Sequence, residues 1–249
     1  MITRLAPTPS GFLHTGNLVN FAVTAHLARE NDAEMLLRID DADTARVRQA
    51  YVQDIFDALS WLGVAWTLGP RSAADVPQWS QRARHSLYQR AARDLHDAGA
   101  AYVCRCSRAQ WADYLGPSCP QACEERRLTL TPGENALRFA HEGLRHVVLW
   151  RREDGPSYHL ASIVDDDHFG VDFVVRGADL EDSTDIQRAI SRALPASRFH
   201  EAAVWHHRLI TDDGGHKLSK SAGYAATAPE RTDALRREID RYVDRLLAD

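Results

Sequence analysis

The beginning of the chain limits the possible folds more than any other stretch. Residues 2–6 form a short, mostly apolar run that ends at Pro7, and from Leu18 onward apolar residues recur at helical spacing. This order predicts a strand, then a loop, then a helix. Gly11 and Gly16 let the loop backbone approach a ligand closely, and the helix N-terminus offers unpaired N–H groups to an anion. The stretch therefore predicts a phosphate-binding site.

The next hundred residues continue the alternation of strands and helices. Residues 34–39 read as a second buried strand, and an amphipathic helix follows from about Tyr51 until Gly63 stops it. A further helix is expected from about Gln78 to Ala98. Because two strands alternate with helices, we predict an α/β fold with a doubly wound, parallel, Rossmann-like sheet.

The pattern changes at residue 100. Residues 100–150 hold all four cysteines and two runs of strand character, 136–140 and 146–150, so we expect an inserted subdomain. The α/β pattern then resumes, with strands expected at 158–164, 171–175 and 202–209, a helix capped by Ser183 or Thr184, and an amphipathic C-terminal helix. The predicted division is 1–99 and 151–200 for the two halves of the catalytic domain, 100–150 for the insert, and 201–249 for a loop and helical segment.

Composition narrows the class of protein. With 249 residues, 44% of them apolar, the chain can build a sizeable core, and no apolar run is long enough to span a membrane. A formal net charge of -5 argues against a protein that grips nucleic acid over its whole surface. Because no leader sequence is evident, we expect a soluble, cytoplasmic protein, and we expect it to act as a monomer.

The cysteines fall within twenty residues, at Cys104, Cys106, Cys119 and Cys123. A disulfide framework would normally be spread more widely, whereas this spacing lies within the range of structural tetrahedral zinc sites. Unliganded thiols are the alternative. We therefore predict a closed, four-thiolate Zn²⁺ site.

Two short motifs far apart in the chain support one another. The first is His14-Thr15-Gly16-Asn17, and the second is Lys217-Leu218-Ser219-Lys220-Ser221 in a polar, glycine-bearing loop. Together they resemble the two signatures of class I aminoacyl-tRNA synthetases. The resemblance narrows to the glutamyl branch and its short members, the glutamyl-queuosine tRNA(Asp) synthetases, and it covers nearly the whole chain.

This resemblance implies ATP-dependent activation of glutamate to glutamyl-adenylate, followed by transfer to the queuosine base of tRNA(Asp). It assigns His14, Gly16 and Asn17 to the phosphates and ribose region of ATP, which enters with Mg²⁺. Lys217 and Lys220 would hold the pyrophosphate as charge develops there. Only 28 residues follow Ser221, which is too few for the anticodon-binding domain that discriminating synthetases carry there. We therefore do not expect a full glutamate–tRNA ligase.

The family also implies an amino-acid site. An acidic residue, here Asp40, would face the ammonium group of the substrate, although it stands where glutamate is usual and is one methylene shorter. Either Arg4 or Arg176 could hold the side-chain carboxylate through a guanidinium fork. The implied amino-acid-binding residues are Arg4, Leu5, Ala6, Pro7, Thr8, Asp40, Tyr158 and Arg176.

Residues of that site could instead have an ordinary structural role. Arg38, Arg176 and the acidic run 165–167 could pair on the surface, and Tyr158 could be a core aromatic. We leave the acidic run unassigned. In the family, a tyrosine stands among the metal ligands where this chain has Cys119; Tyr114 is a less suitable fourth ligand because four residues separate it from Cys119.

Two other functions stay open at this point. One is a ligase that transfers an activated amino acid to a different acceptor. The other is a non-catalytic paralogue that senses an amino acid or nucleotide. Such a sensor would be expected to lose motif residues, whereas His14, Lys217 and Lys220 are all present, which argues against it.

Overall fold

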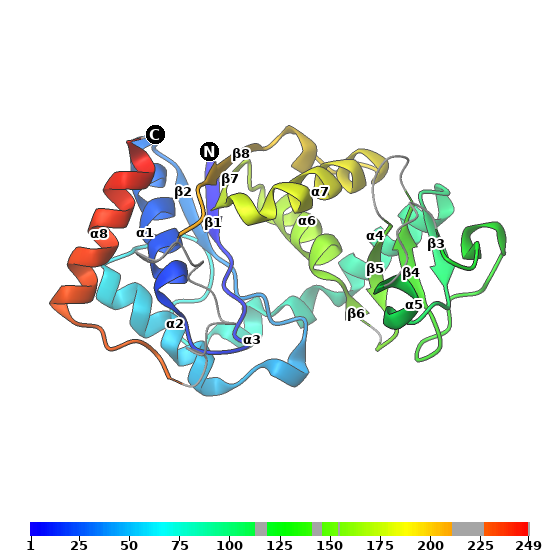
Figure 1. Cartoon of the computed structure of the whole chain (residues 1–249), viewed down its shortest axis with the longest axis horizontal. Helices are drawn as coiled ribbons and strands as arrows, with labels where there is room; N and C mark the ends of the chain where they lie inside the picture. The colour runs from blue at the N-terminus through cyan, green and yellow to red at the C-terminus, as the bar shows by residue number, and fades with distance from the viewer. Residues whose placement is uncertain (113–118, 141–145, 154, 211–226, 249) are drawn as a thin grey trace. The chain divides into compact units, whose positions relative to one another are not determined.

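The computed structural model describes residues 1–112, 119–140, 146–153, 155–210 and 227–248, and its contacts divide the chain into two compact units (Figure 1). The first unit is formed by Met1–Ala83, Val171–Glu181 and Ala202–Asp249, and the second by Arg84–Gly170 and Asp182–Glu201. The four-part division expected from the sequence stays a prediction. Within the described residues, no helix combines the length and apolar character needed to cross a membrane.

Parallel strands organise the first unit. Strand β1 (Ile2–Leu5) pairs in parallel with β2 (Glu34–Leu37), and β7 (Phe173–Gly177) pairs in parallel with β8 (Ala203–His207). Strand β1 also contacts β7, and just before β7 the N–H of Asp172 donates to the carbonyl of Ile2 at 3.1 Å. All four strands therefore end at one edge, which is where open α/β sheets bind their ligands.

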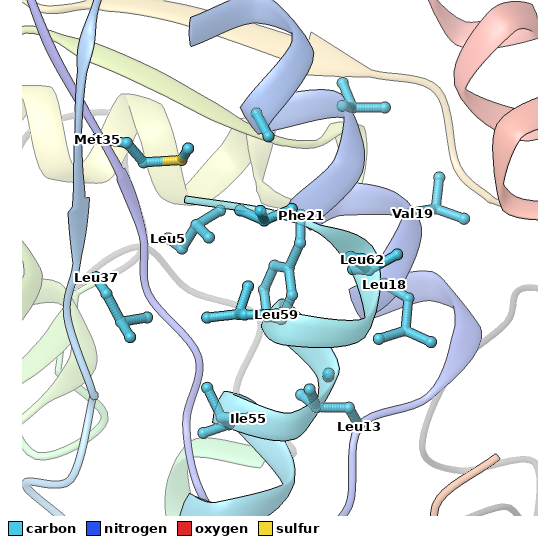
Figure 2. Close-up of a cluster of buried hydrophobic side chains, with 14 of the residues drawn as sticks. Leu5, Leu13, Leu18, Val19, Phe21, Met35, Leu37, Ile55, Leu59 and Leu62 are labelled. Atoms are coloured by element: carbon cyan, nitrogen blue, oxygen red, sulfur yellow. The ribbon is translucent and has the colours of Figure 1, made fainter. Parts of the chain in front are cut away.

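Three helices accompany these strands: α1 (Thr15–Glu30), α2 (Gln49–Leu62) and α8 (Asp233–Leu247). Figure 2 shows Leu5, Leu37, Phe21, Ile55 and Leu59 gathered in the cluster between the strands and the first two helices. The apolar face of α8 packs against α1. The core thus confirms the predicted parallel α/β arrangement and the predicted C-terminal amphipathic helix.

The second unit contains an antiparallel sheet in the order β3 (Ala101–Cys104), β4 (Ala136–Phe139), β5 (Val147–Arg151) and β6 (Gly155–Pro156). Its main helices are α4 (His85–Asp97), α6 (Tyr158–Phe169) and most of α7 (Glu181–Ala193). The two strands expected near 136–140 and 146–150 are confirmed as β4 and β5. Short helices elsewhere are α3 (Val76–Trp79) and α5 (Arg108–Ala112).

Three local predictions were wrong. Residues 158–164 are not a strand but the first part of α6, whose N-cap Ser157 accepts a hydrogen bond from the N–H of Leu160 at 3.5 Å. A short apolar run cannot separate a buried helix from a buried strand by periodicity alone. The helix expected from Gln78 to Ala98 is divided between α3 and α4, and α7 begins at Glu181, so Ser183 and Thr184 lie inside it rather than capping it.

The acidic run on α6 is not a surface feature, because Asp165 is fully buried. The guanidinium of Arg84 forks onto its carboxylate, with Nε–Oδ1 and Nη2–Oδ2 distances of 2.7 and 3.1 Å. The hydroxyl of Tyr88 also donates to Oδ1 at 2.7 Å. Burial, together with the negative charge of Asp165, raises the pKa of Tyr88, so this hydroxyl stays protonated and donates.

This buried pair yields a stability prediction. Replacing Asp165 with alanine leaves the buried Arg84 guanidinium without its counter-ion, so the free energy of unfolding should fall by about 3–5 kcal/mol. Urea unfolding followed by circular dichroism measures the change. The control is Asp97→Ala, whose side chain is 79% exposed and whose loss should change stability by no more than about 0.5 kcal/mol. Equal stability of the two variants would contradict the prediction.

Candidate functional site

The loop between β1 and α1 presents the first sequence motif at the ligand-binding edge of the strands. His14 is the extended N-cap residue of α1, and its N–H donates to the side-chain Oδ1 of Asn17 at 3.2 Å. The carbonyl of His14 in turn accepts from the N–H of Asn17 at 2.8 Å. These reciprocal bonds hold the two polar residues of the motif together at the positive end of the helix dipole.

The buried carboxylate of Asp54 holds the loop between β1 and α1 in place. Oδ2 of Asp54, on α2, accepts from the N–H of Leu13 at 2.8 Å. The other oxygen accepts from the guanidinium of Arg231, which also donates to the carbonyl of Asp54 at 3.0 Å. Asp54 is only 5% exposed, so one carboxylate ties the peptide preceding His14 to the segment that leads into α8.

The motif residues line a pocket of about 250 Å³ within the first unit. His14, Gly16 and Asn17 contribute from the start of α1, and Arg176, Asp179 and His207 contribute from the ends of β7 and β8 and the turn after β7. The structure therefore brings three of the predicted ATP-binding residues, His14, Gly16 and Asn17, together with one predicted amino-acid-binding residue, Arg176. An anion in this pocket would meet a helix N-terminus and a guanidinium.

The two candidate arginines are buried and are not surface ion-pair partners. Arg4 on β1 is 6% exposed and Arg176 on β7 is 3% exposed. Nη1 of Arg4 donates to the carbonyl of Val175 at 3.5 Å, which joins it to the strand that carries Arg176. Both cations thus originate from adjacent strands of the first unit, which suits recognition of a carboxylate or phosphate.

The segment that follows β1 is held extended beside β2. The N–H of Arg38 donates to the carbonyl of Leu5, and that of Asp40 donates to the carbonyl of Pro7, both at 2.9 Å. Ala6 is partly buried and Thr8 is exposed. The backbone from Arg4 to Thr8 is therefore fixed by strand-like hydrogen bonds next to the predicted acidic residue.

Asp40 has a protein partner that the sequence did not indicate. Nε and Nη2 of Arg38 donate to its two carboxylate oxygens at 2.6 and 3.2 Å, and Arg38 is only 2% exposed. The neighbouring Asp41 accepts from the hydroxyl of Ser80 at 2.7 Å and the N–H of Gln81 at 2.8 Å. A substrate ammonium would thus share the Asp40 carboxylate with a guanidinium.

Three predicted site residues remain: Tyr158, Lys217 and Lys220. Tyr158 is the first residue of α6 and is 44% exposed, so it is not a core aromatic. It belongs to the second unit and Arg176 to the first, and their joint role stays a prediction. Lys217 and Lys220 lie outside the described residues.

The four cysteines converge in the second unit. Their sulfur atoms all lie within 4.8 Å of one another, and all four side chains are buried. The Sγ–Sγ distances from Cys119 to Cys104 and Cys106 are 3.7 and 3.4 Å, too long for a disulfide bond of about 2.05 Å. A tetrahedral site with Zn–S bonds of about 2.3 Å requires sulfurs roughly 3.8 Å apart. The cluster therefore has the size and donor set of a four-thiolate metal site.

The surroundings of the cluster favour its closure around an ion. Tyr102 and Trp111 pack beside the cysteines, and the N–H of Cys119 donates to Oε1 of Glu124 at 3.1 Å. Burial raises the pKa of the Cys106 and Cys123 thiols above the ordinary value. Since metal ligation requires thiolates, binding of an ion at this site would release protons.

Four residues at or near the pocket were not identified from the sequence: Asp54, Asp179, His207 and Arg231. Asp54 carried one usable signal, because it lies on α2 beside the inward-facing Ile55 and a charged residue is rarely buried unless it is paired. Asp179 also carried a signal, because it stands three residues after the predicted Arg176. His207 and Arg231 carried none, because they approach the motif only through contacts between distant segments.

Known proteins resemble the chain along most of its length. The family described as tRNA synthetases class I (E and Q), catalytic domain, matches residues 1–126 and 134–246. A Glutamyl-Q tRNA(Asp) synthetase of Rhodobacter capsulatus is 33% identical, with 94% of this chain and 95% of that protein covered. A protein of the same name from Synechococcus is 36% identical over 93% of this chain and 78% of its own length.

A solved structure shows the same fold. The crystal structure of a glutamate-tRNA synthetase from Elizabethkingia anophelis superimposes with a TM-score of 0.69 at 22% sequence identity, covering 92% of this chain. This chain spans about half of that protein, 54% of its length. The predicted fold class is thereby confirmed.

The anchor beneath the first motif can be tested by a double-mutant cycle. We expect Asp54→Ala and Arg231→Ala to destabilise the protein non-additively, with a coupling energy of about 1–3 kcal/mol, because each removes the partner of the same buried ion pair. Urea unfolding of the two single variants and the double variant measures this energy. The control cycle pairs Arg231→Ala with Asp57→Ala, an exposed carboxylate on the same helix that accepts from Gln53, and should be additive within about 0.5 kcal/mol. If the destabilising effects of Asp54→Ala and Arg231→Ala simply add, the ion pair between these two residues contributes nothing to stability.

Proposed function

Because the chain belongs to the class I tRNA synthetases of the glutamate and glutamine type, we propose that it uses ATP to activate glutamate and transfers the glutamyl group to the queuosine base of tRNA(Asp). The relatives that carry this name match it over most of both chains. The proposal includes a cytoplasmic location, where transfer RNA is found. It also includes a single chain as the working unit.

The observation that carries the proposal is the pocket at the start of α1. It joins an anion-binding helix N-terminus, with His14 and Asn17 at its mouth, to the buried guanidinium of Arg176. Amino-acid activation needs two anions, an amino-acid carboxylate and a triphosphate, to be held together despite their mutual repulsion. Positive charge from the helix N-terminus and from Arg176 would meet that requirement, in a lining that also contains Asp179.

In the first step, the α-carboxylate of glutamate attacks the α-phosphorus of ATP, and pyrophosphate leaves with the electron pair of the broken P–O bond. The reactants supply nucleophile and leaving group, so the protein contributes position and charge. His14, Gly16 and Asn17 would hold the nucleotide, and either Arg4 or Arg176 would hold the side-chain carboxylate of glutamate. Lys217 and Lys220 remain assigned to the departing pyrophosphate, with Mg²⁺ on the ATP phosphates.

The remaining contacts of glutamate are assigned along the segment from Arg4 to Thr8, at Asp40 and at Tyr158. Asp40 already carries the Arg38 fork, so an ammonium group would bind to its remaining lone pairs. In the second step, a nucleophilic group of the acceptor attacks the activated carbonyl and AMP leaves.

The cysteine cluster is assigned to a structural Zn²⁺ ion. Cys104, Cys106, Cys119 and Cys123 provide four buried sulfur donors at distances that suit a tetrahedral ion. Four protein ligands leave no open coordination position, so the ion would tie the end of β3 to the turn around Cys123 and take no part in the reaction.

We predict ATP–pyrophosphate exchange that depends on an amino acid, with glutamate the best of the common twenty and without tRNA. The physical reason is that activation needs only ATP and the amino acid, for which this proposal assigns binding residues on the chain itself. Labelled pyrophosphate incorporation into ATP, measured with each amino acid in turn, is the assay. Absence of exchange with every amino acid would contradict the proposal.

Two variants control this experiment. Arg176→Gln removes the guanidinium and should lower kcat/KM for glutamate by about 10–100-fold, the range for losing a charge-assisted hydrogen bond. Arg93→Gln, an exposed arginine of the second unit, should leave the exchange unchanged. An effect of equal size in both variants would argue against carboxylate recognition by Arg176.

We also predict one zinc ion per chain in protein purified without chelator, because the buried sulfurs are spaced for tetrahedral ligation. Elemental analysis by mass spectrometry measures the metal. Cys119→Ala should lose most of the zinc, whereas Ser107→Ala, an exposed neighbour of the cluster, should retain it. Metal-free wild-type protein would contradict this assignment.

A further inference from the structure

His207 at the end of β8 is held in one tautomer by its neighbour. Its Nδ1 lies 2.8 Å from the carbonyl oxygen of Arg208, and a carbonyl only accepts, so Nδ1 carries the proton and donates. Burial lowers the pKa of His207 below its ordinary value, which keeps the ring neutral near pH 7. The other ring nitrogen, Nε2, is therefore an acceptor with a free lone pair.

That acceptor has no hydrogen-bond partner among the described residues. His207 is only 5% exposed, and its Nε2 is buried and unsatisfied, an arrangement that costs free energy unless another molecule donates to it. The same side chain lines the pocket at the start of α1, together with Asn17 and Arg176. The ring that carries the unsatisfied acceptor therefore lines the pocket assigned to ATP.

The side chains of His207 and Asp179 lie close to the backbone of Gly177. A Cβ atom placed on Gly177 would lie 2.4 Å from Oδ1 of Asp179 and 3.4 Å from Cε1 of His207. Glycine at this position therefore lets both side chains pack against the backbone of β7. The ring of His207 is held by this close packing near Cε1 and by the hydrogen bond from Nδ1 to the carbonyl of Arg208.

We propose that Nε2 of His207 accepts a hydrogen bond from the nucleotide bound in this pocket and thereby helps to select it. This inference rests on the proposed function and adds a specificity-determining residue to it. Because the ring offers only an acceptor, the nucleotide must present a donor. ATP has donors of two kinds, the exocyclic amine of adenine and the ribose hydroxyls.

Ligand analogues and a ring-preserving variant test the proposal together. Isothermal titration calorimetry, without amino acid, compares the binding of Mg²⁺-ATP, Mg²⁺-ITP, 2′-deoxyATP and 3′-deoxyATP. His207→Phe keeps an aromatic ring but removes the acceptor, so ATP should bind about tenfold more weakly. Wild-type protein should bind one analogue about tenfold more weakly than ATP, and the variant should bind that analogue and ATP equally. A weak ITP identifies the adenine amine as the donor, and a weak deoxy analogue identifies a hydroxyl.

Two further variants keep the test decisive. His207→Gln offers an amide oxygen in place of Nε2 and should keep most of the discrimination, which covers the case in which the phenylalanine variant does not fold. His26→Phe changes a partly buried histidine of α1 outside the pocket and should bind every nucleotide like wild type.

Different results would contradict the inference about His207 and the proposed function. Unchanged discrimination between ATP and its analogues in His207→Phe would overturn the proposal, even if overall affinity fell, because the role would then be structural. Loss of all discrimination in a folded His207→Gln variant would also overturn it. Failure of the wild-type protein to bind ATP would instead overturn the proposed function itself.

Discussion

Parallel pairing of the strands in the first unit is the constraint on which the site depends. Strand β1 pairs with β2 and contacts β7, and β7 pairs with β8, so segments up to two hundred residues apart end at one edge. Main-chain hydrogen bonds set that register and leave the loops after each strand free to carry polar residues. The polar residues of the pocket follow directly from this arrangement, because they stand at strand ends or at the start of the helix that follows β1.

Buried charges around the pocket fall into two groups. The first group is neutralised inside the protein: Asp40 by Arg38 and Asp54 by Arg231, each through a guanidinium. These pairs hold backbone segments in place, since an unpaired buried charge would be strongly destabilising. The second group lines the pocket: Arg176, the first turn of α1, and His207 with its unsatisfied Nε2. The first group holds backbone segments in place, and the second is the one to which the proposed function assigns ligand recognition.

The cysteine cluster solves a separate problem in the second unit. The strand β3 ends at Cys104, and the turns that follow contain few large apolar residues to hold them against the sheet. Four buried sulfurs at tetrahedral spacing would provide, with an ion bound, a point of attachment that does not depend on a large apolar core. The same strand contributes Tyr102 to the small cluster around the sulfurs, so the cysteines and the sheet share one packed region.

The sequence by itself determined the features that depend on local pattern. The strand, loop and helix at the N-terminus, the stop of α2 at Gly63, the amphipathic α8 and the grouping of the four cysteines all follow from spacing and residue type. Short apolar runs were less informative: residues 158–164 form a helix, and a run this short does not distinguish a helix from a strand by periodicity. Only the tertiary structure decided the partners of buried polar groups. Arg231 meets Asp54 across 177 positions of the chain, and the Nε2 of His207 is left without a partner among the described residues, because packing between distant segments selects those contacts. Arg38 and Asp40 are only two residues apart, but the spacing alone did not show that the two side chains are buried as an ion pair.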